Sequence, residues 1–322
     1  MNFKDLKKSL SNGVKPIYLL HGDDAFLLER GVRILIDGSI VDETLNLTRY
    51  EGSELKGETD KLISALTSYP FMGDKRVVLV KEYYPLASDI KNLKKYFENP
   101  CETTVFIIAN SSSSESLLKL PSVTEVNCSK GDEALCSMWI KSEAKKAGVQ
   151  ISEGAVNKII DYCYADMTKI NGEVEKLVAF ALKSGKITET DVDALCVKEL
   201  DYKAYEVVEF IASKKYDSAY NCLSEIFASG SESQKLFVSL YYHFRKLLYV
   251  SLSNSLTDRE IAIMLKTKEY PIKLARRQAK SFPVKRLKQI VDKLSLYDER
   301  FKQGYVEPQS AIWNGIFNIL VG

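Results

Sequence analysis

Residues that could hold a nucleotide follow the first apolar segment of the chain, residues 15–22. A strand that ends in glycine and leads into a helix is where many α/β domains bind nucleotide phosphates. Such a loop needs further glycines, a lysine for the phosphates, and a serine or threonine for magnesium. Here Gly22 is followed by Asp23 and Asp24, whose carboxylates repel polyphosphate, and Gly-Lys-Ser/Thr occurs nowhere in the chain. The sequence predicts the shape of a nucleotide-binding domain without its chemistry.

Side chains for metal binding or catalysis are sparse. The six cysteines form no Cys-x-x-Cys pair, so we expect reduced, mostly buried thiols rather than a zinc or redox site. Two histidines, His21 and His243, leave little for a histidine metal site or a catalytic triad. The predicted strand that ends at Val80 leads into Lys81 and not into an acidic metal ligand. No carboxylate spacing singles out a catalytic pair. We therefore expect no catalytic residue, no metal and no cofactor.

A helix and a strand are predicted on either side of Pro70. Leu62, Ile63, Leu66 and Tyr69 recur at helical spacing and predict one apolar helix face that runs to Tyr69. Pro70 ends this helix because it lacks an N–H and disfavours helical backbone at the residue before it. Four consecutive apolar residues, 77–80, predict a buried strand.

Two large apolar side chains, Phe71 and Met72, stand in the connector between that helix and that strand, ahead of the turn signal Gly73-Asp74. Connectors usually run over the surface, so these side chains either fold back onto the core or face a partner. Because most apolar side chains pack inside a protein, the pattern alone favours the core.

A basic window spans residues 266–302, with twelve lysines and arginines against four acids. The whole chain carries a net charge of only +2, so the positive charge is concentrated here. Such a window is either a nucleic-acid footprint or a solvated helical surface that faces acidic neighbours. The second interpretation is the commoner one.

Length and composition predict a soluble globular protein of two or three domains. The chain has 322 residues, of which 45 % are hydrophobic and 27 % are charged. Apolar runs such as residues 105–109 are too short to span a membrane. The N-terminal segment is charged and lacks the apolar region of a signal peptide, so we expect a cytoplasmic protein.

Strands alternate with helices over the first 131 residues, which predicts a parallel α/β sheet. The expected strands lie near residues 15–22, 77–80, 105–109 and 123–126. After Gly131 the strand signals stop and helical patterns take over. Four helices are expected up to residue 200, the first with Leu135, Met138, Trp139 and Ser142 near one face. Five or six more are expected beyond it, with new helices starting at or near Pro271, Pro283 and Pro308.

Four motifs, in order along the chain, resemble the delta-subunit family of the bacterial DNA polymerase III clamp loader. The first, residues 17–28, is similar to the family's opening strand and degenerate nucleotide loop. The second is Pro-Phe-Met-Gly-Asp-Lys-Arg-Val-Val at residues 70–78. The third joins Trp139-Ile140 to residues 167–177, like the family's lid helix. The fourth, residues 298–304, is like its D-x-x-x-K-x-G motif. Together they cover essentially the whole chain.

The resemblance implies three domains: an AAA+-like, P-loop-type α/β clamp-binding domain (1–131) that binds no nucleotide, an all-α lid (132–200), and an all-α collar (201–322) that assembles a ring of five. It also implies a role. The family's delta subunit binds the sliding clamp, the beta subunit, and opens its ring for loading onto primed DNA during replication. It does so without hydrolysing ATP, as a non-catalytic part of a DNA-directed DNA polymerase holoenzyme. The implied partners are the clamp, the gamma/tau and delta prime subunits through the collar, and primed DNA.

The resemblance also assigns a site. The family inserts a Leu-Phe-like pair into a hydrophobic pocket of the clamp, and this pair maps onto Pro70 and Phe71, with Tyr69 and Met72 as flanking contacts. The chain departs from the family at Pro70, where leucine is usual. Two alternatives remain open: a DNA-binding helical protein that uses residues 266–302, and an ATP-dependent AAA+ enzyme, which the missing Gly-Lys-Ser/Thr disfavours.

Overall fold

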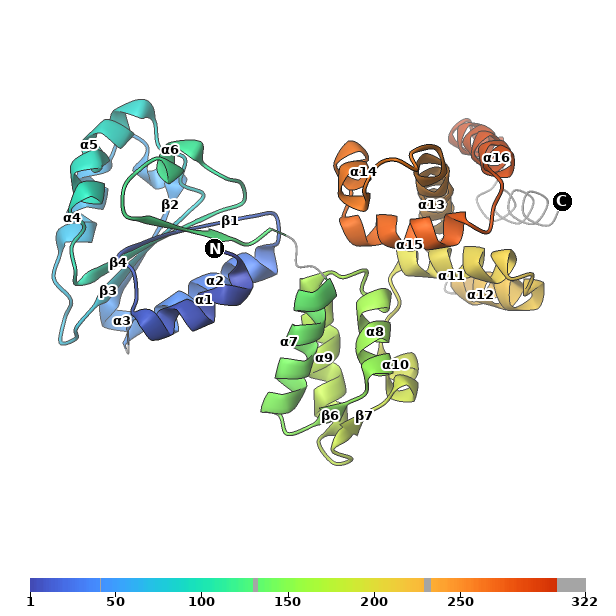
Figure 1. The fold of residues 1–322 in the computed structure, drawn as a ribbon, viewed down its shortest axis with the longest axis horizontal. Coiled ribbons are helices and arrows are strands. Elements are labelled where there is room, and N and C mark those ends of the chain that lie inside the picture. Colours follow the sequence, from blue (N-terminus) through green and yellow to red (C-terminus); the bar gives the residue numbers. More distant parts are fainter. Residues whose placement is uncertain (41, 130–132, 229–232, 306–322) are drawn as a thin grey trace. The chain divides into compact units, whose positions relative to one another are not determined.

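The computed structural model describes the whole chain except residues 41, 130–132, 229–232 and 306–322. The chain divides into two compact units, Met1–Gly131 and Asp132–Gly322. Figure 1 shows a sheet with helices in the first unit and mostly helices in the second. No helix among the described residues is long and apolar enough to cross a bilayer.

Five parallel strands form the sheet of the first unit, in the order β2-β3-β4-β1-β5. The central strands β3, β4 and β1 are almost wholly buried, as expected for apolar runs with helices on both faces. Their bounds are β1 Ile17–His21, β2 Leu47–Glu51, β3 Arg76–Lys81, β4 Thr104–Asn110 and β5 Val123–Asn127. The predicted fold class, a parallel α/β domain followed by all-α parts, is confirmed.

Helices α1 (Phe3–Ser9) and α2 (Ala25–Asp37) cover one face of the sheet, and α4 (Thr59–Thr67) and α5 (Ala87–Glu98) cover the other (Figure 1). The core on the second face joins apolar side chains of α4 and α5 to alternate residues of the strands: Leu62, Ala65, Leu66, Leu93, Phe97, Ile17, Leu19, Val78, Val80, Phe106 and Ile108. The short helices α3 (Glu43–Asn46) and α6 (Glu115–Leu118) complete the unit.

Strand β2 was not predicted. Its sequence, Leu-Thr-Arg-Tyr-Glu, is mostly polar, and its residues are exposed or half-buried because it forms an edge of the sheet. An edge strand of this kind carries no continuous apolar signal. It nevertheless pairs in register with β3, Leu47 beside Val77, and so brings the end of α3 to the start of β3.

The second unit begins with four helices, α7 (Glu133–Lys146), α8 (Glu153–Tyr162), α9 (Met167–Ala181) and α10 (Glu189–Leu195). Ser152 caps α8, and Thr188 with Asp191 forms a capping box at the N-terminus of α10. One correction applies here. The two-residue strands β6 (Gln150–Ile151) and β7 (Lys186–Ile187) pair in parallel where no strand was expected. Of the residues expected near one face of α7, Met138 is exposed.

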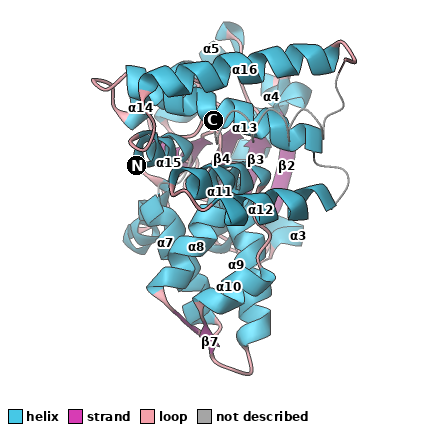
Figure 2. Cartoon of the chain, turned by 90° about the vertical axis from the view of Figure 1, so that its right-hand side faces the viewer, coloured by secondary structure: helices cyan, strands magenta, loops and turns pink. Residues whose placement is uncertain are grey.

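Six further helices are described beyond residue 199. They are α11 (Leu200–Ala212), α12 (Tyr216–Ala228), α13 (Ser233–Leu252), α14 (Asp258–Met264), α15 (Glu269–Ala279) and α16 (Val284–Lys302). Helix α13 packs against α11, α15 and α16 (Figure 2). Pro271 is the third residue of α15 and Pro283 directly precedes α16, close to the predicted positions, whereas Pro308 lies outside the described residues. The predicted division of this unit at residue 200 stays a prediction.

Candidate functional site

The connector between α4 and β3, residues 68–75, exposes three large apolar side chains. Tyr69 is 84 % exposed, Phe71 59 % and Met72 92 %. Pro70, the fourth predicted site residue, is half-buried between them. The pattern-based expectation that Phe71 and Met72 pack in the core is wrong, because the core under this edge is completed by residues of α4 and of the strands. Clustered apolar side chains on a surface are typical of interaction sites, which makes the connector the candidate site.

Helix α4 ends at Thr67, two residues earlier than predicted. The Thr67 hydroxyl donates a hydrogen bond to the Ile63 carbonyl oxygen at 2.9 Å, and the Ser68 hydroxyl donates one to the Ser64 carbonyl oxygen at 2.6 Å. Ser68 already has extended backbone angles. These hydroxyls satisfy carbonyls that a continued helix would have used, and Pro70 disfavours helical backbone at the residue before it. Tyr69 therefore leaves the apolar face of α4 and faces solvent.

The backbone of Phe71 is held by the side-chain amide of Asn46, at the end of α3. The Phe71 N–H donates to Asn46 Oδ1 at 2.7 Å, and Asn46 Nδ2 donates to the Phe71 carbonyl oxygen at 3.0 Å. Asn46 itself is 5 % exposed. Sequence reasoning missed this residue, since 25 positions separate it from Phe71 and no local pattern links the two. A buried side chain thus fixes the backbone of an exposed aromatic residue.

The chain turns sharply after Phe71. Met72 has a φ of 50°, in the left-handed region, which costs a residue with a side chain about 1–2 kcal/mol. Arg76 then begins β3, and its backbone N–H donates to the Thr103 carbonyl oxygen at 2.9 Å. The Arg76 guanidinium also donates to the Thr48 hydroxyl at 2.9 Å. Lys75 and Arg76 therefore lead the chain into β3.

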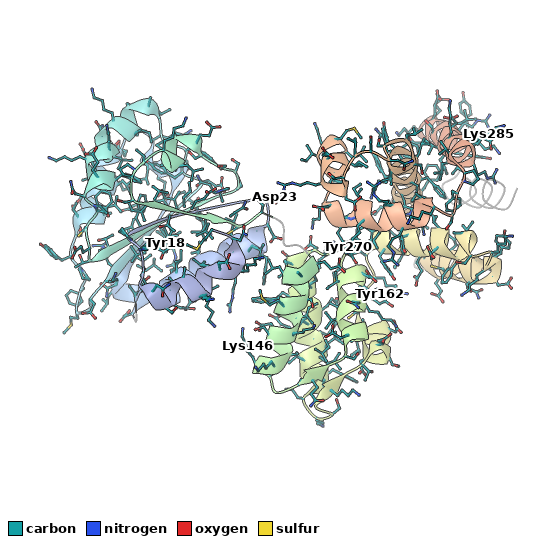
Figure 3. All side chains as sticks on the ribbon, in the orientation of Figure 1. Tyr18, Asp23, Lys146, Tyr162, Tyr270 and Lys285 are labelled. Carbon is teal, nitrogen blue, oxygen red and sulfur yellow. The ribbon has the colours of Figure 1, made fainter. Side chains whose placement is uncertain are left out.

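The loop after β1 is tightly packed and carries an acidic side chain where a nucleotide-binding loop holds phosphate. A Cβ atom placed on Gly22 would lie 2.2 Å from the carbonyl carbon of Cys128, so this loop packs directly against the backbone after β5. The Asp24 carboxylate accepts a hydrogen bond from the Leu27 N–H at 3.1 Å, at the N-terminus of α2. Helix N-terminal N–H groups are what a phosphate would bind. A carboxylate of the chain takes that place, and Asp23 lies exposed beside it (Figure 3).

Polar groups at the ends of β3 and β4 bind one another. Asn110, fully buried, accepts from the Tyr83 N–H at 2.9 Å and donates to the Tyr83 carbonyl oxygen at 2.9 Å. The Glu82 carboxylate accepts from the N–H and the hydroxyl of Ser111 at 2.8 and 2.9 Å. No group of three or more His, Cys, Asp or Glu side chains that could hold a metal lies within the described part of the chain. The polar side chains described at this edge of the sheet therefore hold neighbouring segments of the chain together.

Two family models match the chain. One, described as DNA polymerase III, delta subunit, matches residues 18–127, and the other, DNA polymerase III delta subunit, C-terminal domain, matches residues 201–318. The chain belongs to the DNA polymerase III delta subunit family.

Two relatives of the chain match over nearly their whole length. A DNA polymerase III subunit delta of Bacillus subtilis (strain 168) is 25 % identical over an alignment of 330 positions, which covers 95 % of this chain and 93 % of the relative. The solved structure of the Bacillus subtilis DNA clamp loader delta protein has a TM-score of 0.76 and 22 % identity, and the match covers 99 % of this chain and 100 % of that one. The likeness shows that the two proteins share a fold.

The basic window of this delta-family chain is partly neutralised by its own acids. Four of its cations form ion pairs, two of them with helices before residue 200: Lys268–Asp166 at 2.7 Å, Lys273–Glu133, Arg276–Asp258 at 2.6 Å and Lys302–Asp298 at 2.5 Å. Six others, all after Arg276, are exposed and have no ion pair within the described residues: Arg277, Lys280, Lys285, Lys288, Lys293 and Arg300. Lys285 lies on α16 (Figure 3). The window is thus part structural surface and part free positive charge.

A hydrogen bond between α15 and α8 lies beside one of these ion pairs. The Tyr270 hydroxyl donates to the Asp161 carboxylate, and both residues line a cavity of about 270 Å³ (Figure 3 labels Tyr270). Burial raises the pKa of Asp161, the hydrogen bond from Tyr270 opposes that rise, and burial raises the pKa of Tyr270 as well. Lys273 and Glu133, which pair with each other, also line the cavity. Its charges are largely balanced from within, which favours a structural role.

Proposed function

We propose that this chain is the clamp-binding subunit of a replicative clamp loader and that residues 69–72 are its contact with the sliding clamp. The single observation that carries the proposal is the connector itself, which holds three large apolar side chains in solvent while the backbone of Phe71 is held by the buried side chain of Asn46. Family membership supports the same role.

Phe71 is the proposed anchor. Burying a phenylalanine side chain contributes about 1.5–3 kcal/mol, and aromatic anchors in pockets dominate the energetics of protein interfaces. Tyr69 and Met72 lie on either side of it, and their exposure leaves them free to cover the rim of the same pocket. Pro70 stiffens the chain directly before the anchor.

Ring opening follows from binding alone in this account. A protein that binds the open form of a ring more tightly than the closed form shifts the ring towards opening, with no chemical step of its own. The Asp24 carboxylate at the N-terminus of α2 and the tight packing of Gly22 support a subunit that neither binds nor hydrolyses ATP. We assign ATP hydrolysis to other subunits of the loader, gamma/tau, which together with delta prime would meet this chain through residues 201–322. A cytoplasmic location agrees with this role.

The direct test measures the affinity of the full chain for its cognate sliding clamp by surface plasmon resonance. Phe71→Ala is expected to weaken binding at least tenfold, because about 1.4 kcal/mol corresponds to a factor of ten. Phe180→Ala is the matched control, since Phe180 on α9 is also 59 % exposed. That control is expected to bind like the wild type.

Circular dichroism checks that both variants keep the fold. A Phe71→Ala protein that binds the clamp like the wild type, or an equal loss in both variants, contradicts the assignment of the connector.

A second proposed function is contact with primed DNA through the basic window. Besides the four exposed lysines, a cavity of about 260 Å³ is lined by Arg245, Lys246 and Lys266, none of which forms an ion pair among the described residues. Burial lowers the pKa of Lys246, so an anion beside it would stabilise its charged form. Phosphate contacts make binding steeply dependent on salt.

Titration of the full chain with a primer–template duplex at two salt concentrations tests this second function. We expect micromolar binding that weakens steeply with salt and weakens further in Lys285→Glu/Lys288→Glu. Binding that ignores salt and this double substitution rules out the window as a DNA contact.

A further inference from the structure

We propose that Asn46 is the positioning residue of the connector: its side-chain amide fixes the backbone of Phe71, so that the aromatic ring is held out in solvent ready for the partner. The inference rests on the proposed function, because it concerns the same contact. It adds a residue that lies 25 positions earlier in the chain and whose buried side chain offers almost no surface to a partner.

The geometry suits a carboxamide. One planar group accepts from the Phe71 N–H at 2.7 Å and donates to the Phe71 carbonyl oxygen at 3.0 Å. A carboxylate has no hydrogen to donate, a hydroxyl is too short to bridge both groups, and an apolar side chain makes neither bond. The two bonds together fix both peptide groups that flank the Phe71 Cα atom.

These two hydrogen bonds attach the middle of the connector to the rest of the protein. Among the described residues, no other hydrogen bond joins residues 69–75 to the rest of the protein. The next attachments are Ser68, bonded back onto α4, and Arg76, already in β3. Without Asn46, seven consecutive residues with three exposed apolar side chains would be tethered only at their ends.

Asn46 is itself anchored. Its own N–H donates to the Asp42 carbonyl oxygen at 3.2 Å, and the Asp42 carboxylate caps α3 by accepting from the Thr44 N–H at 2.8 Å. Glu43, in the same turn, pairs with Arg33 of α2 at 2.6 Å. The next residue, Leu47, is already in register with Val77 of the sheet. Asn46 therefore connects the backbone of Phe71 to the capped helix α3 and, through Leu47, to the sheet.

Preorganisation explains why a partner-binding segment would carry such an attachment. A segment that is ordered only on binding loses conformational entropy at that moment, and this weakens the complex. A segment that is already ordered in the free protein avoids the loss. Asn46 therefore raises clamp affinity without touching the clamp, and all of its effect passes through Phe71.

A purely structural role makes a different prediction. If Asn46 only stabilised the fold, its substitution would change the unfolding midpoint and would change clamp binding equally whether or not residue 71 is aromatic. If it positions Phe71, the binding effect disappears once the ring is gone. A double-mutant cycle separates the two cases.

The experiment compares clamp affinity of the full-length wild type, Asn46→Ala, Phe71→Ala and the double variant, with clamp concentrations high enough to measure weak complexes. Asn46→Ala is expected to weaken binding five- to twentyfold in the wild-type background and less than twofold in the Phe71→Ala background. Hydrogen exchange of the Phe71 amide is expected to speed up at least tenfold. Asn171→Ala, which removes an exposed amide on α9, is the control and leaves all three readings unchanged.

Asn46→Asp keeps the shape and the acceptor but turns the donor into a second acceptor facing the Phe71 carbonyl oxygen, and it serves as the main variant if Asn46→Ala fails to fold. It is expected to weaken binding at least as much as alanine. Wild-type binding by the folded Asn46 variants while Phe71→Ala loses binding overturns the positioning role and leaves the proposed function standing. Wild-type binding by Phe71→Ala overturns the proposed function itself. An equal loss from Asn46→Ala in both backgrounds also overturns the positioning role.

Discussion

Two asparagines in the first unit make the same pair of hydrogen bonds, one to a buried aromatic residue and the other to an exposed one. Asn110 bridges the N–H and the carbonyl oxygen of Tyr83, and Asn46 bridges those of Phe71. Tyr83 is 2 % exposed and belongs to the core, whereas Phe71 is mostly exposed. In both cases the side-chain amide makes the two hydrogen bonds that the backbone of a neighbouring strand would make, at a residue outside β3.

The difference lies in what surrounds the aromatic residue. Around Tyr83 the chain is closely packed: a Cβ atom on Gly52 would lie 2.1 Å from the Glu82 carbonyl oxygen. Around Phe71 the described protein leaves one side open. The same pair of hydrogen bonds therefore stabilises the core in one place and holds the proposed binding surface in the other, and the two should respond differently to substitution.

The largest expected effect is on the buried member of the pair. Asn110→Ala leaves two buried backbone groups of Tyr83 unpaired, and each such group costs about 1–3 kcal/mol. We expect the first unit to lose about 3 kcal/mol of unfolding free energy, measured by hydrogen exchange of the β3 and β4 amides. Asn46→Ala should cost less, because the Phe71 backbone can reach water. Equal losses from the two substitutions would mean that the two sites do not differ.

A third amide, that of Gln278, holds a side chain that titrates. His243 Nε2 and Gln278 Oε1 lie 2.5 Å apart in the core of α11–α16. Burial lowers the pKa of His243 to about 4, while the hydrogen bond to Gln278 opposes that shift. The unfolded chain therefore takes up a proton below about pH 6.5, whereas the folded chain does so only near pH 4, and stability falls as the pH falls through this window.

Between pH 7 and pH 5 we expect the second unit to lose about 2 kcal/mol of unfolding free energy. Tryptophan fluorescence reports this loss, because both tryptophans of the chain lie after residue 131. His243→Gln should flatten the pH dependence. The Asn46 and Asn110 bridges contain no titrating group, so a matching pH dependence of the hydrogen-exchange protection factors at Phe71 and Tyr83 would contradict this contrast.

The smallest expected effect concerns the turn after Phe71. Met72→Gly relieves left-handed strain but makes the unfolded chain more flexible, so we expect a net gain of only about 0.5 kcal/mol in stability. Clamp affinity should fall two- to fivefold with the loss of the side chain. Met72→Ala removes the same contact and keeps the strain, so it should match the loss of affinity without the gain in stability. A larger loss of affinity from glycine than from alanine would show that the turn matters more than the side chain.

Much of the fold can be predicted from the sequence because the patterns that specify it are local. The apolar runs of β1, β3 and β4, the Ser152 cap and the Thr188 capping box each lie within a few residues. The elements that were missed depend on distant partners. Strand β2 is an edge strand with little burial, and β6 and β7 are two residues each.

The candidate site divides in the same way. Phe71 and its neighbours were predicted through the family resemblance, whereas the pattern alone placed Phe71 and Met72 in the core. Asn46 could not have been found, since an asparagine at the end of a short helix looks like any turn residue. Its role depends on the pairing of β2 with β3, which brings residues 46 and 71 together only after the sheet has formed.

Hydrogen exchange of the full chain with and without its cognate sliding clamp tests the central claim most directly, because it asks where the clamp binds without altering any residue. Peptides covering residues 68–75 are expected to gain strong protection, while those covering the loop after β1 and the ends of β3 and β4 stay unchanged. Clamp binding that protects other segments and leaves residues 68–75 exchanging as in the free protein would contradict the account.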